Sequence, residues 1–304
     1  MYNGRDYIAQ QLDSILKQTI TDWDLVVSDD GSTDGCIDIV KNYMAKDSRI
    51  KLVFNDGKDA VHGFKANFAN ALDHADGEYI AFCDQDDVWT ADHLEVLLEG
   101  IKDYDVCGAN AELTDKDLKS LGTRMLSDTS YTLFDPKTIF SHLLYNNIFQ
   151  GTAMLLRTDF VKKHLPVPSY MKYHDHWFAL NASVEGRANY VNKSVLLYRQ
   201  HGDNQTKNDN MNFFKYVHRS FFANDTVGHK NTDTILMLTE LKERIADADK
   251  KRQVEDAIRY FTNMDTGHKR RNVFFYAANY STIYLAKKDR MFFLRLIKRF
   301  IFGL

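Results

Sequence analysis

The sequence of 304 residues has few of the residues that mark several common classes of protein. It contains only three prolines, which excludes a proline-rich linker. Its three cysteines are odd in number and widely spaced, which fits neither a disulfide framework nor a zinc site and is typical of reduced thiols in the cytoplasm. No apolar run approaches 18 residues, and the N-terminus lacks a signal-peptide pattern.

Positive charge is not in excess either. The 39 lysines and arginines are balanced by 42 aspartates and glutamates, for a net charge of -3. Nucleic acid is therefore not expected as a partner, because no basic field attracts a polyanion. Hydrophobic residues make up 44% of the chain, which is enough for one large core and a smaller annex.

Apolar segments of strand length alternate with segments of helical periodicity through the first two hundred residues. This alternation predicts an α/β fold with a mostly parallel sheet flanked by helices. We expect a first domain over residues 1–206 and a helical C-terminal region over 207–304, because strand patterns disappear after about Gly202. The expected strands are 24–28, 51–54, 78–83 and 105–110, and the expected helices are 7–20, 34–44, 64–74 and 91–101.

Acidic clusters follow two of the expected strands. They are "VVSDDGSTDG", residues 26–35, and "FCDQDD", residues 82–87. Parallel strands bring their carboxyl ends to one edge of a sheet, where ligands bind. Carboxylates gathered there suit Mg²⁺ or Mn²⁺ with a phosphate group completing the shell. The alternative is a pair of polar turns, each with an aspartate that caps the next helix.

These motifs, taken in order, resemble the inverting nucleotide-sugar glycosyltransferases of family 2, which have the GT-A fold. The resemblance covers roughly residues 2–206 and includes "YNG", "SDDGSTDG", "FCDQDDVW", "HDHW" and "YRQHGDNQ". The ordered set is specific, although each motif alone is weak. The forms "CDQDD" and "YRQHGDNQ" look most like bacterial rhamnosyltransferases that make cell-surface polysaccharides.

The resemblance implies roles in binding a nucleoside-diphosphate sugar. Asp86 matches the metal ligand, which would neutralise the leaving diphosphate, and Asp84 matches the residue that reaches the ribose. Lys65 begins a helix near the phosphates, with a solvated surface lysine as the alternative. The remaining residues implied at the base or ribose are Tyr2, Asn3, Asp29 and Asp30, of which Asp30 could instead brace its loop.

The resemblance also implies a base and an acceptor pocket. Asp175 in "YHDHWFAL" matches the base that removes the acceptor proton, and its alternative is a helix N-cap. His201 matches a second metal ligand, while Arg199 would contact phosphate or brace the acceptor loop. The candidate acceptor-binding residues are Gln150, Gly151, Thr152 and His174, for which the alternative is a simple buried strand with a structural histidine.

One departure from the family is large. Its members begin with a β-strand before "YNG", whereas this sequence starts at "MYNG". An unfilled central slot would expose backbone donors and acceptors. We therefore expect that the recorded start lies downstream of the natural one, and the alternative is that another segment fills the slot.

The leading function is therefore metal-assisted transfer of a sugar, with inversion, to a glycan or a lipid-linked acceptor. The motif style leans toward dTDP-rhamnose, and UDP-hexoses remain open as donors. One alternative is a sugar nucleotidyltransferase, which would want a Gly-rich, basic loop near the N-terminus that does not appear. The other is an idle nucleotide-sugar-binding relative, which would tend to lose Asp86, Asp175 or His201.

The C-terminal residues 290–304 form a basic, amphipathic segment. Apolar residues at 292, 293, 296, 297, 300 and 301 recur at helical spacing and predict a single stripe. The pattern fits a helix lying in the interface of the inner face of the membrane. It fits equally an ordinary amphipathic helix packed on the catalytic domain, or a dimer contact, because a core-facing stripe has the same sequence pattern.

Overall fold

The computed structural model describes residues 1–56, 61–127, 135–171, 173–200, 231–266 and 268–285, and near the C-terminus 292–294, 296, 297 and 300. The chain divides into two compact units. The first contains Met1–Ser127, Ile148–Val167 and Tyr173–His201, and the second Asp128–Asn147, Pro168–Lys172 and Gly202–Leu304. The boundary predicted near residue 207 lies outside the described residues, so the division into 1–206 and 207–304 stays a prediction.

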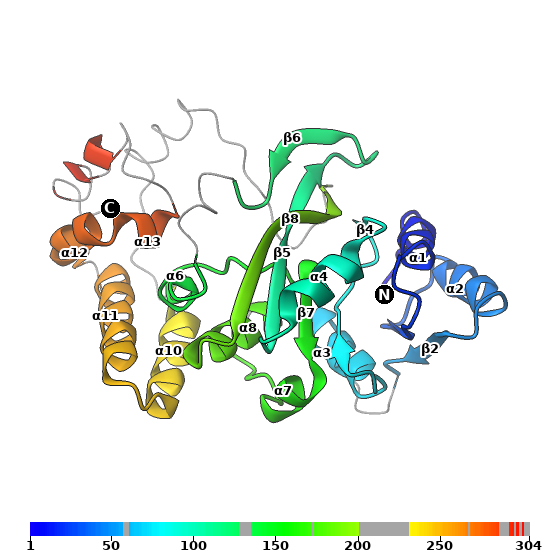
Figure 1. Ribbon diagram of the computed structural model, residues 1–304, viewed down its shortest axis with the longest axis horizontal. Helices are drawn as coiled ribbons and strands as arrows, with labels where there is room; N and C mark the ends of the chain where they lie inside the picture. The colour runs from blue at the N-terminus through cyan, green and yellow to red at the C-terminus, as the bar shows by residue number, and fades with distance from the viewer. Residues whose placement is uncertain are drawn as a thin grey trace. The chain divides into compact units, whose positions relative to one another are not determined.

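Strands and helices alternate through the first unit (Figure 1). Helical spacing places Ile8, Leu12 and Ile15 on the buried face of α1. The strands are β1 (Leu25–Asp29), β2 (Ile50–Phe54), β3 (Tyr79–Ile80), β4 (Val88–Trp89), β5 (Val106–Thr114), β6 (Ser120–Arg124), β7 (Met154–Arg157) and β8 (Ala188–Arg199). The helices are α1 (Ile8–Leu16), α2 (Cys36–Met44), α3 (Phe64–Leu72), α4 (His93–Ile101), η1 (Gly151–Ala153), α7 (Thr158–Lys163) and α8 (His174–Val184).

The strands form a two-stranded parallel sheet and a six-stranded sheet of mixed direction. β1 pairs with β2 in parallel, and β5 pairs with β8 in parallel. β7 runs antiparallel between β3 and β5, β4 runs antiparallel to β8, and β6 pairs antiparallel with β5. The predicted α/β architecture is confirmed, but the strand direction differs from the mostly parallel expectation. An apolar run of strand length carries no information about direction.

The N-terminal residues lie between the two acidic segments. The amino group of Met1 donates to the Ser28 carbonyl (2.5 Å), and the Met1 carbonyl accepts from Asp30 N–H (2.9 Å), as in a parallel strand pair. The Gln85 side chain bonds the N–H and carbonyl of Tyr2 at 2.8 and 2.9 Å. The chain start therefore connects β1 to the loop after β3, although these strands share no ladder among the described residues.

The core of the first unit lies around β5. This strand is buried along nearly its whole length, and α4 packs across it and β8 (Figure 1). Leu97 and Ile101 of α4 are buried against Cys107 and Val195 of the sheet. A second core lies between α1, α2 and the β1–β2 sheet.

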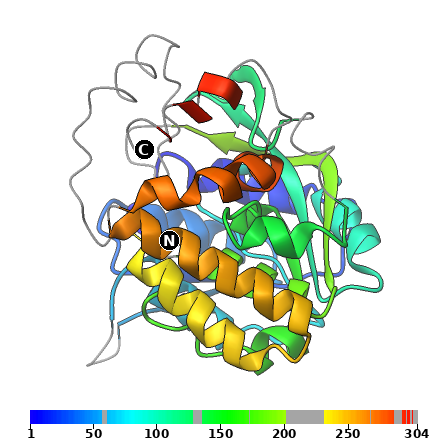
Figure 2. The same cartoon turned by 90° about the vertical axis from the view of Figure 1, so that its left-hand side faces the viewer.

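The second unit is helical in its described parts. α10 and α11 lie side by side (Figure 2). The carboxylate of Asp247 caps α11 by accepting from the N–H groups of Asp249 and Lys250. Its elements are α6 (Ile139–Leu143), α10 (Thr232–Arg244), α11 (Ala248–Asp265), η2 (Lys269–Asn272), α12 (Val273–Ala278) and α13 (Tyr280–Tyr284). The predicted helical C-terminal region is thus confirmed.

The apolar residues near the C-terminus differ in their exposure. Phe292 and Leu296 pack against an aromatic cluster that includes Tyr276 and Tyr280 of the second unit. Three others are exposed: Phe293 at 66%, Ile297 at 51% and Phe300 at 67%. In the described part of the chain, no helix has the length and apolarity needed to cross a membrane.

Candidate functional site

The acidic loop Asp84–Asp87 joins β3 to β4 and is held by distant parts of the first unit. Arg199, at the end of β8, donates from Nε to the Asp86 carbonyl (2.8 Å). The buried Asp87 carboxylate accepts from Arg199 N–H (3.2 Å) and from the Thr152 hydroxyl (3.0 Å). These contacts fix the backbone of the loop, and therefore the positions from which its carboxylate side chains extend.

Two carboxyl groups of this loop have raised pKa values. Burial, with the nearby charges of Asp86 and Asp175, raises the pKa of Asp84 to about 7. Burial and the charges of Asp84 and Asp86 raise the pKa of Asp87 well above its ordinary value. The predicted metal ligand, Asp86, and the predicted base, Asp175, therefore belong to one group of carboxylates that repel one another.

Such a group fits a divalent cation. Asp84 and Asp86 offer the oxygen ligands that Mg²⁺ and Mn²⁺ prefer, and a dication would offset their repulsion. Mg²⁺ is commonly bound by one or two carboxylates, with water and phosphate oxygens as the other ligands. No group of three or more His, Cys, Asp or Glu residues among the described ones has metal-site geometry. His201, the second predicted ligand, lies outside the described residues.

The candidate base, Asp175, lies in the first turn of α8. Its Oδ2 accepts from Gly151 N–H (3.1 Å), and its Oδ1 accepts from His176 N–H (2.6 Å). Both bonds orient the carboxylate and stabilise its charged form, which is the form a base requires.

His174 packs among aromatic rings. Its ring centroid lies 4.4 Å from that of Phe82 and 5.0 Å from that of Phe68. Burial lowers the pKa of His174 to about 4, so the imidazole is neutral near pH 7. Its buried Nε2 has no hydrogen-bond partner. The predicted acceptor contact of His174 remains a prediction, to be weighed against this packing role.

Gln150, Gly151 and Thr152, the other candidate acceptor residues, begin the turn before β7. Gly151 and Thr152 are buried in η1, and Gln150 precedes it as the N-cap. The Thr152 hydroxyl is used by Asp87, and the Gly151 N–H by Asp175. The structure thus places these residues beside both acidic groups, and an acceptor contact by them stays a prediction.

The first acidic cluster shapes the loops around the end of β1. Asp29 Oδ2 accepts from Gly31 N–H and Ser32 N–H, each at 3.0 Å, while its buried Oδ1 has no partner. Asp30 accepts from Gly63 N–H (2.7 Å) and contacts His62 Nδ1 (2.8 Å). Asp30 therefore braces the segment that leads into α3, as its predicted alternative states.

Three further candidates lie at the surface near this cluster. Tyr2 is 59% exposed. Asn3 has a φ of 46° and accepts from Thr33 N–H through its Oδ1 (2.9 Å). Lys65 is exposed in the first turn of α3. Their exposure leaves them accessible to a ligand, and their predicted roles at the nucleotide stay predictions.

Sequence reasoning missed two polar residues that support the acidic loop from α1. Gln11 Nε2 lies 2.7 Å from Cys83 Sγ, and Ser14 Oγ accepts from Trp89 N–H (3.1 Å). Both are buried on the apolar face of α1. The sequence did contain a signal for them, since both polar residues interrupt the apolar face of a predicted helix. A buried polar group needs a hydrogen-bond partner, so such a residue indicates a contact with another segment.

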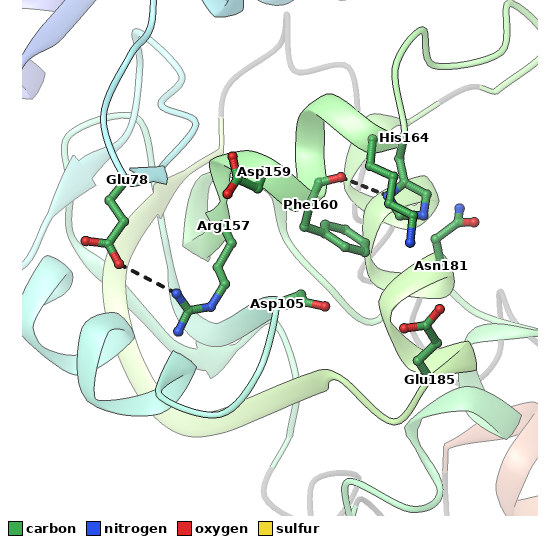
Figure 3. Close-up of a pocket in the computed structure, with 9 residues that line it drawn as sticks. Glu78, Asp105, Arg157, Asp159, Phe160, His164, Asn181 and Glu185 are labelled. Atoms are coloured by element: carbon green, nitrogen blue, oxygen red, sulfur yellow. Dashed lines mark hydrogen bonds and ion pairs between the residues drawn. The ribbon is translucent and has the colours of Figure 1, made fainter.

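A cavity of about 320 Å³ lies elsewhere in the first unit. Figure 3 shows Glu78 paired with Arg157 at this cavity, at 3.6 Å between the charged atoms. The residues that line this cavity do not include Asp84, Asp86, Asp87 or Asp175. We assign it no part in the chemistry.

The chain resembles curated proteins over part of their length. It is 41% identical over 101 residues to the putative teichuronic acid biosynthesis glycosyltransferase TuaG of Bacillus subtilis. It is 40% identical over 97 residues to the UDP-Glc:alpha-D-GlcNAc-diphosphoundecaprenol beta-1,3-glucosyltransferase WfgD of Escherichia coli. Each alignment covers 32% of this chain, but only 38% of TuaG and 36% of WfgD.

A solved structure and a family model indicate the same class of protein as these relatives. The mannosyltransferase PcManGT of Pyrobaculum calidifontis, solved with GDP-Man and Mn²⁺, has a TM-score of 0.58 and 14% identity. That comparison covers 100% of this chain and 83% of PcManGT, and it supports the GT-A-like α/β fold. The model of the family "Glycosyl transferase family 2" matches residues 1–165, more than half of the chain. The chain therefore belongs to glycosyl transferase family 2.

Proposed function

We propose that this protein transfers a sugar, with inversion, from a nucleoside-diphosphate sugar to an acceptor hydroxyl during polysaccharide synthesis. One observation carries the proposal: Asp84 lies close enough to both Asp86 and Asp175 for their charges to help raise its pKa. Inverting transfer needs a diphosphate site and a base on opposite sides of the reacting carbon, within one small site. Membership of family 2 supports the reaction class.

The acidic residues have separate proposed roles in the reaction. Asp175 accepts the acceptor proton while the acceptor oxygen bonds to the anomeric carbon and the bond to the diphosphate breaks. Asp86, with Asp84 beside it and His201 as the second predicted ligand, would hold Mg²⁺ or Mn²⁺. When bound, the dication supplies the positive charge that stabilises the leaving diphosphate. Asp29, Tyr2, Asn3 and Lys65 are the proposed donor-site residues, and Asp30 and Arg199 brace the loops beside them.

The donor we favour is dTDP-rhamnose, on the motif style of "CDQDD" and "RQHGDNQ". The printed name of WfgD specifies UDP-Glc, and PcManGT was solved with GDP-Man, so other nucleotide sugars belong in the test. The acceptor we propose is a glycan or a sugar on a lipid diphosphate, the second being the kind of acceptor in WfgD's name.

We further propose that residues 290–304 bring the enzyme to the inner face of a membrane, where a lipid-linked acceptor would reside. Phe293, Ile297 and Phe300 are exposed, which is unusual for such large apolar side chains in a group. The stretch 287–304 contains six basic residues and one acidic residue, a charge that favours anionic lipid.

The test of function is the release of free nucleoside diphosphate. Purified protein is incubated with Mn²⁺ and each of dTDP-rhamnose, UDP-glucose and GDP-mannose, with and without a lipid-diphosphate sugar acceptor. Turnover of at least one donor, stimulated by acceptor, is expected. No release from any donor would reject the proposed function and leave a binding role.

A further inference from the structure

Gly151 and Thr152 are adjacent residues that contact two different acidic elements. The Gly151 N–H donates to Asp175 Oδ2 at 3.1 Å, and the Thr152 hydroxyl donates to Asp87 Oδ2 at 3.0 Å. One short turn, η1, therefore joins the candidate base at the start of α8 to the loop that carries Asp86.

The contact between Thr152 and Asp87 is shielded from water. Each residue is only 2% exposed. The other oxygen of Asp87 accepts from the N–H of Arg199. A carboxylate bonded through both oxygens keeps one orientation, and removing one donor leaves a buried oxygen unpaired.

Gly151, on the other side of the turn, also has close neighbours. A Cβ at this position would lie 3.3 Å from His174 Nε2 and 3.5 Å from Asp175 Oδ2. A methyl group would therefore touch the Asp175 carboxylate at ordinary van der Waals distance and would crowd only His174, which would have to shift by a few tenths of an ångström.

We propose that Thr152 is a positioning residue: through Asp87 it fixes the acidic loop at a set distance from the Asp175 carboxylate. The inference rests on the proposed transfer reaction, in which the acceptor hydroxyl and the leaving diphosphate must lie in line. Small misplacements of reacting groups cost up to about a hundredfold in rate. The 2% exposure of Thr152 favours this role over direct contact with the acceptor.

The decisive variant is Thr152→Val, which keeps the shape and removes the hydroxyl. We expect kcat to fall about ten- to a hundredfold, with the KM of donor and acceptor within about threefold of wild type. Thr152→Ser should restore kcat to within about threefold, because it keeps the donor. Gly151→Ala, which crowds His174 beside Asp175 from the other side of the turn, should also lower kcat without raising KM, and it serves if Thr152→Val does not fold.

Thr158→Val is the matched control. Thr158 is 5% exposed, and its hydroxyl donates to the Gly77 carbonyl (2.5 Å) just beyond the other end of β7. Its loss removes a threonine hydroxyl hydrogen bond, here a partly buried one, away from the acidic groups. We expect lower stability, but kcat within about twofold of wild type at temperatures where the protein is folded.

The coupling itself is tested in an Asp175→Asn background. There Thr152→Val should lower the residual rate by less than about threefold, since no base remains to be misaligned. Equal losses in both backgrounds, equal losses in Thr152→Val and Thr158→Val, or a rise in acceptor KM alone would each overturn the inference while transfer itself stands. A wild-type protein that turns over no sugar nucleotide would instead reject the proposed function.

Discussion

His93, the first residue of α4, should make the first unit sensitive to acid. Its side chain is 0% exposed, and its ring stacks on that of Trp89 with centroids 3.8 Å apart. Nδ1 lies 2.9 Å from the Val195 carbonyl and therefore carries the hydrogen. Burial lowers the pKa of His93 to about 3, from an ordinary value of 6.5.

The sign of the effect follows from these two pKa values. Above pH 6.5 the imidazole is neutral in both states and adds no pH dependence. Between pH 6.5 and about 3 only the unfolded chain binds the proton, so the free energy of unfolding falls as the pH falls. At pH 5 the loss amounts to about 2 kcal/mol. His174, whose pKa burial lowers to about 4, adds a loss of the same sign to every variant compared.

The assay is urea unfolding at pH 7 and pH 5 for wild type and His93→Phe, which keeps the stacked ring and removes the titration. The difference between the two pH values should be about 2 kcal/mol smaller in His93→Phe, whatever its absolute stability. The exposed His74, changed to Phe, is the control and should behave as wild type. Equal pH differences in wild type and His93→Phe would refute the reasoning. Fluorescence reports on the first unit, to which all three tryptophans belong: Trp23, Trp89 and Trp177.

Three further outcomes are expected. Asp86→Ala should lower activity by about a hundredfold or more and abolish its dependence on divalent cation, and full wild-type turnover in excess EDTA would contradict the metal role. Asp175→Asn should slow transfer by roughly two to four orders of magnitude with unchanged donor affinity by calorimetry; a parallel loss of donor binding would make Asp175 a donor residue. A chain ending at Lys288 should sediment less than the full chain with anionic liposomes, in a salt-sensitive way, by about 1 kcal/mol per basic residue lost; equal sedimentation would remove the membrane proposal.

Local periodicity predicted most elements up to residue 110 well, but it gave no expectation for β6, α7, α8 or the long strand β8. In α1 the apolar residues at positions 8, 12 and 15 recur at helical spacing and are all buried. The strand expected over 78–83 was too long, since only Tyr79 and Ile80 pair with β7. Ladder pairing depends on the partner strand, which a single segment of sequence does not reveal.

The support of the site could not be predicted, because it is made by contacts between distant residues. Asp87 meets Thr152 across 65 positions, and Arg199 meets Gln10 across 189. The exposure of the apolar residues in the C-terminal stripe could not be predicted for a related reason. Phe292 and Phe293 are neighbours with the same apolar character, but only the first packs against the aromatic cluster. Which apolar residues find a partner is decided by tertiary packing.

Arg199 shows why the acidic loop needs such support. Its guanidinium donates to the Asp86 carbonyl (2.8 Å), the Lys116 carbonyl (2.5 Å) and Gln10 Oε1 (2.5 Å), and the residue is only 2% exposed. This placement favours a bracing role for Arg199 over direct contact with phosphate. Repelling carboxylates tend to move apart unless their backbone is held. A loop held in this way can meet the charge that develops on the leaving diphosphate without first rearranging, which is the condition for electrostatic catalysis.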